Sequence, residues 1–347
     1  MNYQLLGRSG LRVSDLCLGT MTFGDDWGWG SAKDEARKIY DAFREAGGNF
    51  IDTANLYTAG TSERFVGEFI ANHRQEVVLA TKYTNSAPGK DANAGGNQRK
   101  NMIQAVEASL KRLGTDYIDL YWLHIWDQIT PAEEVMRAFD DLVRSGKILY
   151  IGISDAPAWV VAKSNTMAEI RGWTRYVGLQ IEYSLLERTV ERELLPVAKD
   201  QGMTILAWSP LRSGLLTGKY LPENEETNSK EARLNSEMMK GFATLDEAGR
   251  RIVREVVALA KEMGVTSAQV ALAWLRHRSV PVIPIIGARK LRQLEDNLKS
   301  LEITFSAGQL RRLDEASKVS LGFPHDFLDV EMVRTFTFGG LRDRIKA

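Results

Sequence analysis

The sequence predicts a parallel (β/α)₈ barrel, and two observations support this fold class. Eight short apolar runs alternate with longer amphipathic stretches along the chain. Strands that alternate with helices form a parallel sheet with helical crossovers, and eight such units close naturally into a barrel. In addition, 347 residues suit a barrel with insertions. We therefore predict one barrel domain over residues 1–347.

The eight predicted strands are mostly separated by segments long enough for a helix. They are Leu16–Leu18, Asn49–Asp52, Val77–Thr81, Ile118–Leu123, Ile148–Ile151, Val177–Gln180, Thr204–Ala207 and Val282–Pro284. The alternative is an open doubly wound sheet, which should carry a GxGxxG turn directly after its first strand. Residues 19–24 are GTMTFG and do not fit that pattern. The barrel is therefore favoured.

Several predicted helices carry start signals. Ser31 with Asp34 resembles a capping box, and Thr266 with Gln269 is a clearer one. Pro131 can open the helix that follows it, because its missing N–H costs nothing in a first turn.

Three stretches lie outside the strand–helix repeat. Tyr3–Val13 is expected to form a hairpin that caps the bottom of the barrel. Pro210–Asp246 is too long and polar for a simple connection, and we expect a functional loop after the seventh strand. After Phe305 we expect a helix to about Ser317 and then a tail. The sequence leaves open whether loop and tail form a pocket lid or a subunit contact. The tail carries Phe323, Phe327, Phe336 and Phe338.

Composition excludes several function classes. The 45 basic and 45 acidic residues cancel, so nothing favours nucleic acid or an anionic membrane as a partner. Cys17 is the only cysteine and the four histidines are scattered, which argues against a disulfide within the chain and against a metal site. The first residues lack a signal-peptide core, and no apolar run approaches the ~20 residues of a membrane span. We expect a cytoplasmic, metal-free protein.

Four ionisable residues follow three successive predicted strands. Asp52 ends the second strand, Tyr57 lies in the loop after it, Lys82 ends the third strand, and His124 ends the fourth. Each alone could be a helix cap, a surface charge or an ordinary polar residue. In a parallel barrel, however, all four reach the carboxyl-terminal rim, where barrel enzymes carry their chemistry.

This set suits the reduction of a carbonyl group, because hydride transfer places negative charge on an oxygen that must then be protonated. Tyr57 would be the acid, and Lys82 would lower its pKa, since a nearby ammonium favours phenolate. Asp52 would hold Lys82. His124 would orient the substrate oxygen or share the proton relay, and the sequence does not decide between these two roles.

The chain resembles the aldo-keto reductase family over most of the predicted barrel. The matching segments lie between residues 7 and 298 and include GRSGLRVSDLCLGTMTFG, NFIDTANLYTAGTSERFVGEFI, LATKYT, SLKRLGTDYIDLYWLHIWD, GKILYIGISDAPAW, LQIEYSLLER, ILAWSPLRSGLLTGKY and PVIPIIGARKLRQLEDNL. The resemblance implies a catalytic tetrad of Asp52, Tyr57, Lys82 and His124, which agrees with the roles above. It also implies a nicotinamide cofactor, NADP(H).

The segment after the seventh strand suits a clamp over a pyrophosphate, because it combines glycines, hydroxyls and cations. The resemblance implies that Arg289 meets the adenosine 2′-phosphate, which favours NADP over NAD. The expected cofactor contacts are Gly19, Thr20, Met21, Asp52, Ser154, Asp155, Gln180, Trp208, Ser209, Pro210, Leu211, Ser213, Gly214, Lys219, Gly287, Arg289, Gln293 and Asn297. In this set Trp208 stacks on the nicotinamide, and Gln293 and Asn297 lie near the adenine.

Asp155 departs from the resemblance, because many relatives carry Asn at this position. With Ser154 and Gln180 it would surround the nicotinamide carboxamide. An ionised Asp only accepts hydrogen bonds, whereas Asn also donates them. We hypothesise that the Asp155 charge favours the oxidised, positively charged nicotinamide.

Aromatic residues near the rim predict a pocket for a flat or bulky apolar carbonyl compound. The expected lining is Met21, Phe23, Trp27, Trp29, Tyr57, His124 and Trp126, with parts of the tail. The segment GISDAPAW is closest to aryl-alcohol dehydrogenase-like members, which points to aromatic aldehydes, with bulky cyclic ketones or secondary alcohols also open.

We therefore expect an NADP(H)-dependent oxidoreductase that interconverts aldehydes or ketones and alcohols, as a monomer or a homo-oligomer. The alternative is a cofactor-binding regulatory module like the channel β subunits of this family. The tetrad is compatible with both, and the lack of an extended arm before the barrel weakens the alternative. An isomerase or lyase on this fold lacks a supporting motif.

Overall fold

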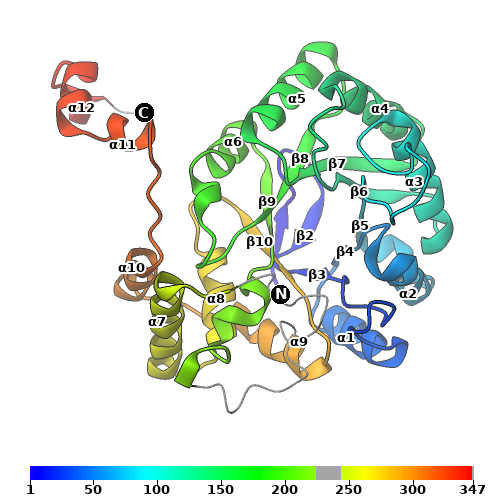
Figure 1. Ribbon diagram of the computed structural model, residues 1–347, viewed down its shortest axis with the longest axis horizontal. Coiled ribbons are helices and arrows are strands. Elements are labelled where there is room, and N and C mark those ends of the chain that lie inside the picture. The colour runs from blue at the N-terminus through cyan, green and yellow to red at the C-terminus, as the bar shows by residue number, and fades with distance from the viewer. Residues whose placement is uncertain (224–243, 346–347) are drawn as a thin grey trace.

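The computed structural model describes residues 1–223 and 244–345, and their core is a closed barrel of eight parallel strands (Figure 1). The strands pair in the order β10-β3-β4-β5-β6-β7-β8-β9. The strands are β3 (Cys17–Gly19), β4 (Phe50–Asp52), β5 (Val78–Tyr83), β6 (Ile118–Leu123), β7 (Ile148–Ser154), β8 (Tyr176–Glu182), β9 (Thr204–Trp208) and β10 (Val282–Ile286). All eight predicted strands are present, which confirms the fold class.

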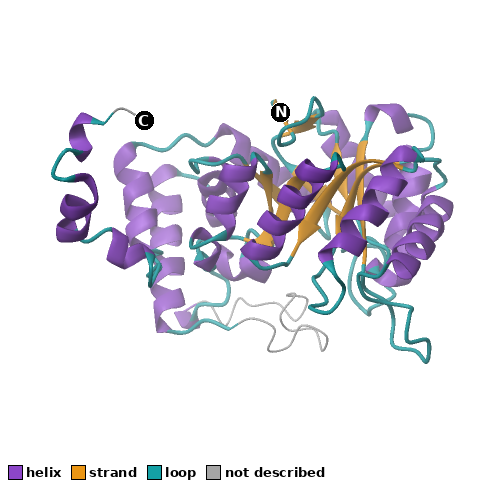
Figure 2. Cartoon of the chain, turned by 90° about the horizontal axis from the view of Figure 1, so that it is seen from above, coloured by secondary structure: helices purple, strands orange, loops and turns teal. Residues whose placement is uncertain are grey.

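Helices surround the barrel and cover its outer face (Figures 1 and 2). They are α1 (Lys33–Glu45), α2 (Thr61–Ile70), α3 (Arg99–Leu113), α4 (Ala132–Arg144), α5 (Ala158–Arg171), α6 (Leu194–Gln201), α7 (Glu247–Met263), α8 (Ser267–Arg276), α9 (Leu291–Leu298) and α10 (Ala307–Ala316). The predicted loop 210–246 lies partly outside the described residues, which resume at residue 244.

Two of the three predicted helix starts are capping boxes. The capping box of Thr266 with Gln269 is present at the start of α8. The box of Ser31 with Asp34 is wrong: α1 begins at Lys33 with no side-chain cap, and the Ser31 hydroxyl donates to the carbonyl of Arg289. Ser31 lies too far ahead of the helix to cap it and instead ties this loop to the one after β10.

Pro131 sits immediately before α4 rather than inside its first turn. Its carbonyl accepts the N–H groups of Glu134 and Val135, so it starts the helix from the capping position.

The predicted N-terminal hairpin is confirmed. Strands β1 (Tyr3–Leu5) and β2 (Arg12–Ser14) pair antiparallel. Leu6 and Val13 are fully buried against side chains of the barrel interior. The N–H of Gly7 donates to the Thr204 hydroxyl at the start of β9 (2.8 Å), which places the hairpin over the amino-terminal end of the barrel.

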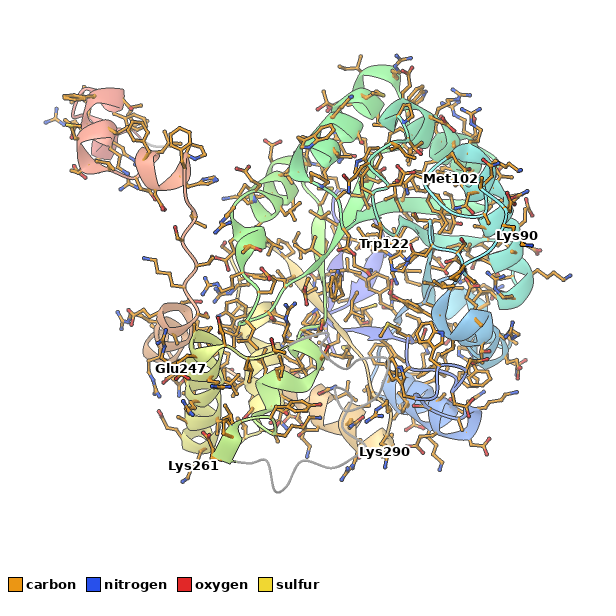
Figure 3. All side chains as sticks on the ribbon, viewed as in Figure 1. Lys90, Met102, Trp122, Glu247, Lys261 and Lys290 are labelled. Carbon is orange, nitrogen blue, oxygen red and sulfur yellow. The ribbon has the colours of Figure 1, made fainter. Side chains whose placement is uncertain are left out.

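Trp122 of β6 fills the barrel interior, inside the ring of strands (Figure 3). Its neighbours on β7 and β8 are Gly152 and Gly178, which are paired in register. A Cβ atom on Gly152 would lie 2.2 Å from the indole ring, and one on Gly178 would lie 2.8 Å from it. The two glycines therefore make the room that the indole occupies.

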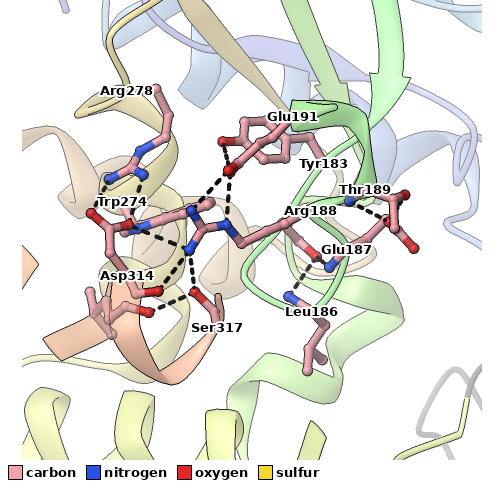
Figure 4. A network of polar contacts seen from close by, with 12 residues as sticks. Tyr183, Leu186, Glu187, Arg188, Thr189, Glu191, Trp274, Arg278, Asp314 and Ser317 are labelled. Atoms are coloured by element: carbon pink, nitrogen blue, oxygen red, sulfur yellow. Dashed lines mark hydrogen bonds and ion pairs between the residues drawn. The ribbon is translucent and has the colours of Figure 1, made fainter. Parts of the chain in front are cut away.

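An ion-pair network joins α10 to the loop after β8 (Figure 4). Arg188 donates to both oxygens of Glu191 and to the Ser317 hydroxyl. Asp314 accepts from Trp274 and Arg278 of the α8 region. These contacts fix the end of the barrel's last surrounding helix.

Beyond α10 the chain leaves the barrel (Figures 1 and 2). It ends in two short helices, α11 (His325–Leu328) and α12 (Glu331–Phe338). The expectation that parts of this tail line the substrate pocket is wrong for this structure, because both helices project away from the strands. The large apolar side chains of this tail are exposed, for example 84% for Phe323 and 76% for Phe336.

Among the described residues, no single helix has the length and hydropathy needed to cross a membrane. Helices α7 and α8 meet these criteria only as a pair, with a 100° bend between them.

Candidate active site

The alternation of side chains along the strands brings the predicted site residues together. On β5, Val78 and Ala80 belong to the barrel interior, so Lys82 must point inward as well. The same period of two turns Asp52 inward after Phe50, and His124 inward after Trp122. We call the carboxyl-terminal end of the barrel, where these side chains gather, the mouth.

The ammonium of Lys82 is fully buried and uses all three of its N–H groups. It contacts Asp52 Oδ1 and donates to the carbonyl of Thr53 (2.8 Å) and to the Tyr57 hydroxyl oxygen (3.1 Å). Asp52 accepts from Gln180 Nε2 with its second oxygen (3.1 Å). Because the Tyr57 oxygen accepts from Lys82, the phenol hydrogen must point away from Lys82.

Burial sets the direction of the pKa change for Tyr57 and Asp52, but not for Lys82. It raises the pKa of the Tyr57 phenol, and Lys82 opposes that rise without cancelling it. The predicted lowering effect of Lys82 on the Tyr57 pKa is present, but the loss of hydration outweighs it, so the pKa is raised overall. Burial also raises the pKa of Asp52, against the effect of Lys82. Burial alone would lower the pKa of Lys82, but Asp52 and Tyr57 raise it.

His124 completes the group at the end of β6. Its ring lies edge-on to the Tyr57 ring, with 5.9 Å between the centroids. Burial, helped by the charge of Lys82, holds the pKa of His124 well below its usual range. At neutral pH the imidazole is therefore uncharged, with one nitrogen that donates and one that accepts.

The next three strands supply the residues predicted around the carboxamide. Ser154 ends β7, and its buried hydroxyl has no hydrogen-bond partner among the described residues. Asp155 adopts a left-handed backbone (φ +43°), and its carboxylate accepts from the indole N–H of Trp208 at 3.0 Å. Solvent reaches Asp155 in the open mouth, but desolvation by the surrounding protein raises its pKa to about 6. Gln180 lies deeper in the barrel, where its side chain donates a hydrogen bond to Asp52.

The loop after β9 is a tight turn of left-handed residues. Ser209, Arg212, Ser213 and Gly214 all have positive φ, and the N–H groups of the last three donate to acceptors within the loop. The Ser213 hydroxyl is buried and has no partner in the described part of the chain. This turn is connected to β9 by Pro210, which is buried, and Leu211, which is half-buried.

Two cations from different loops influence each other here. Lys219 follows the turn and Arg289 follows β10, and desolvation together with the charge of Arg289 lowers the pKa of Lys219. A Cβ on Gly214 would lie 3.3 Å from the Lys219 ammonium, so the lysine lies directly over the turn. Neighbouring cations repel each other unless an anion lies between them. Together with the unpaired Ser213 hydroxyl, they fit the phosphates of a dinucleotide.

Other predicted cofactor residues have structural contacts in this chain. Gln293 Oε1 accepts the N–H of Arg289 (2.9 Å) and thus caps the start of α9. Asn297 is only 4% exposed. The Thr20 side chain faces away from the mouth and contacts Ser62 at 2.8 Å. Gly19 ends β3, Met21 is half-buried, and Gly287 is exposed just past β10.

The predicted aromatic lining divides into two groups. The Trp27 ring lies edge-on to Tyr57 (centroids 6.5 Å apart), so it lines the mouth beside the phenol. Trp29 packs next to Trp27 (6.2 Å) but is itself buried. Trp126 is half-buried two residues past His124. Phe23 is not brought to the mouth surface: it has no exposed area and packs edge-on against Phe69 in the core.

Sequence reasoning missed the polar residues that hold His124. Asn85, directly after β5, contacts the Nδ1 atom of His124 at 3.2 Å. Asn97 and Asp127 exchange two backbone-to-side-chain hydrogen bonds of 2.7 Å and so join the two loops. The available signal was the run of Asn and Asp residues in the loops after two neighbouring strands.

Two surface hollows lie elsewhere and contain none of the tetrad. One of about 530 Å³ is lined by Arg99, Pro131 and Trp173, and one of about 360 Å³ lies beside Met1 and Leu298. Neither contains a buried ionisable cluster. Within the described ranges, no group of three or more His, Cys, Asp or Glu side chains is placed to hold a metal ion.

A parallel barrel with a buried Lys–Asp pair beneath a tyrosine and a histidine defines a barrel oxidoreductase. Comparison with known proteins agrees with this class. Residues 15–318 match the model of the aldo/keto reductase family. The chain belongs to the aldo/keto reductase family.

Curated relatives match nearly the whole chain. A norsolorinic acid reductase of Aspergillus flavus is 39% identical over 334 residues, which cover 93% of this chain and 83% of the relative. An uncharacterized oxidoreductase of Bacillus subtilis is 42% identical over 327 residues, or 91% of this chain and 95% of the relative. An aryl-alcohol dehydrogenase [NADP(+)] of Phanerodontia chrysosporium is 38% identical over 346 residues, or 93% and 87%. The chain is thus aryl-alcohol dehydrogenase-like.

Proposed function

We propose that this protein is an NADP(H)-dependent reductase that converts aromatic or bulky cyclic carbonyl compounds to alcohols and can run in reverse. One observation carries the proposal: the Tyr57 oxygen accepts from Lys82, so its own hydrogen is directed away from the ammonium. A bound nicotinamide would supply or take the hydride.

Tyr57 is the proposed proton donor. Burial keeps the phenol protonated at neutral pH, and Lys82 at 3.1 Å stabilises the phenolate that remains after the proton leaves. Asp52 and the carbonyl of Thr53 hold the ammonium in place. The neutral His124 ring lies beside the phenol, where it can hydrogen-bond the carbonyl oxygen of the substrate.

NADP(H) is the proposed cofactor. Lys219 lies over the turn after β9, and the charge of Arg289 helps to lower its pKa, as expected of a pair that binds phosphate. Trp208, held by Asp155, would offer a flat face to the nicotinamide, and the unpaired Ser154 hydroxyl would meet its carboxamide. The name of the Phanerodontia relative includes NADP(+), which agrees with this choice.

The proposed substrate class follows from the aromatic lining of the mouth. Trp27 stands beside the phenol and is backed by Trp29, and aromatic rings favour flat apolar partners. Relatives named for an aryl alcohol and for norsolorinic acid support an aromatic substrate.

The reaction is tested by following NADPH oxidation with a panel of aromatic aldehydes and cyclic ketones. Tyr57→Phe should lower kcat by about 10²–10⁴-fold while the NADPH Kd stays unchanged, because only the proton donor is lost. Tyr3→Phe is the matched control, since that exposed phenol lies in the N-terminal hairpin and donates to Gly47. Tight NADPH binding without turnover would favour a regulatory binding module instead.

The cofactor choice has its own test. Arg289→Met should weaken NADPH binding by about tenfold or more and leave NADH binding nearly unchanged, because only NADPH carries the 2′-phosphate. Arg292→Met, on the exposed side of α9, is the control for charge removal. Equal losses for both cofactors would contradict the assignment of Arg289 to that phosphate.

A further inference from the structure

Asn85 contacts His124 in a way that constrains the histidine proton. The side-chain nitrogen Nδ2 of Asn85 lies 3.2 Å from His124 Nδ1. An amide NH₂ group can only donate, so Nδ1 must be the accepting nitrogen of the ring. The single proton of the neutral imidazole then resides on Nε2.

The backbone around Asn85 is built to present this amide. Thr84, the preceding residue, has φ +99°, which a β-branched residue rarely adopts. Its hydroxyl accepts from Asn97 Nδ2 (3.0 Å) and from the N–H of His124 (3.3 Å). Its carbonyl accepts the N–H of Gly96 at 2.9 Å. Surrounding contacts thus maintain a strained residue beside the mouth, as is common at functional sites.

A second contact joins Asn85 to the loop that carries Tyr57. Asn55 Nδ2 donates to the carbonyl of Asn85 at 3.0 Å, and the Asn55 N–H donates to the carbonyl of Lys82 at 3.2 Å. Asn85 is therefore fixed from the Tyr57 side by its backbone and reaches His124 with its side chain. It therefore contacts both His124 and the loop that carries Tyr57, the two groups that are proposed to act on the substrate oxygen.

We propose that Asn85 is a positioning residue that holds His124 in the Nε2–H tautomer, so that His124 donates a hydrogen bond to the carbonyl oxygen of the substrate. The substrate-facing role rests on the proposed function, but the tautomer does not. The opposite tautomer would present a lone pair on Nε2 to the negative charge that develops on that oxygen, and this would oppose the reaction.

Asn85→Asp is the informative substitution, because it preserves shape and reverses the hydrogen bond. A carboxylate can only accept, so it requires a proton on Nδ1. Asn93→Asp makes the same chemical change in the same loop at an exposed residue that contacts Asp91 and Gln98. It is the matched control for the added charge.

The tautomer is measured by ¹⁵N NMR of the imidazole rings in the protein without cofactor. The chain has four histidines, and His124→Gln assigns the relevant signals. We expect a bare Nδ1, far downfield, and a protonated Nε2 in the wild type and in Asn93→Asp. In Asn85→Asp we expect Nδ1 to be protonated. A protonated Nδ1 in the wild type, or a bare Nδ1 in Asn85→Asp, would overturn the proposal.

Asn85→Leu provides a second variant if Asn85→Asp does not fold. It neither donates nor accepts, so His124 should become a mixture of both tautomers, and a pure Nε2–H signal would count against Asn85. In turnover, Asn85→Asp should lower kcat for reduction by about 10- to 100-fold with an unchanged NADPH Kd. If the wild type reduces no carbonyl, the proposed function fails while the NMR result still decides the tautomer.

Discussion

The ammonium of Lys82 shows how one residue organises its neighbours. Its three hydrogen bonds to Asp52, Thr53 and Tyr57 use every N–H it has. Asp52 and Tyr57 could be predicted as partners from the sequence, because strand ends of a parallel barrel meet at one rim, whereas the carbonyl of Thr53 was not expected. The direction of the Tyr57 pKa could not, because it depends on how deeply the phenol is buried.

Asn85 shows a different limit of sequence reasoning at the same scale. An asparagine in a polar loop resembles a turn residue, and nothing in the local pattern distinguishes one that contacts a histidine 39 positions away. The positive φ of Thr84, which aims the loop, is also invisible in a single sequence.

Asp155 should make the binding of the two cofactor forms depend on pH. Its pKa of about 6 means that it gains its charge as the pH rises through that value. Above it, the carboxylate should stabilise the positive nicotinamide of NADP⁺ relative to NADPH. The ratio of the NADP⁺ Kd to the NADPH Kd should therefore fall between about pH 5 and 8.

In Asp155→Asn the same ratio should be independent of pH, because the amide does not titrate. The cofactor's 2′-phosphate titrates in this range but is common to both forms, so it cancels in the ratio. Fluorescence titration of both cofactor forms across the range gives the measurement. Equal pH slopes in the two proteins would refute the role of Asp155.

Secondary-structure elements were predictable where apolar runs mark them. All eight strands were found, but several extend further at their carboxyl ends, as β7 does to Ser154 and β8 to Glu182. These ends carry polar or small residues because they serve the mouth, so hydrophobicity does not reveal them. Gln293, which is expected to contact the cofactor, also accepts the N–H of Arg289 at the start of α9, and this structural role was not predicted.

The close packing of Trp122 against Gly152 should be measurable in the free energy of unfolding. Gly152→Ala should destabilise the protein by about 1–3 kcal/mol, because the new methyl group would lie 2.2 Å from the indole ring. In a Trp122→Leu background the same change should cost little. Urea unfolding of the four proteins of this cycle measures the coupling. Gly10→Ala is the control, since nothing lies within 4 Å of its added Cβ.

A large cost of Gly152→Ala in both backgrounds would show that backbone strain, and not the indole, excludes a side chain at this position.

The barrel as a whole followed from the alternation of strands and helices, whereas the course of the tail did not. Exposed phenylalanines in the tail suggested a pocket lining, yet α11 and α12 lie away from the mouth (Figure 1). The direction of a terminal segment depends on contacts that no periodic pattern encodes. By contrast, α10 is fixed by Arg188 and Asp314 at the side of the barrel (Figure 4).

Truncation after Leu321 should leave the stability and the turnover of the protein nearly unchanged. Among the described residues of the removed tail, His325 forms only a surface ion pair with Glu193, and such pairs add little stability. The unfolding temperature should shift by no more than about 2 °C, and kcat/KM should stay within about twofold. A chain that ends at Phe305 should instead lose stability, because it lacks α10. If the chain that ends at Leu321 loses most of its turnover, the removed tail must contribute to the mouth.

The fit of Trp122 against Gly152 and Gly178 also constrains how this barrel can diverge. A larger residue at either glycine is blocked while the indole is present, and a smaller residue at position 122 first opens a cavity. Every single-step path to a different interior therefore passes through a less stable protein. We expect the three positions to be inherited as a set and to change together when they change at all.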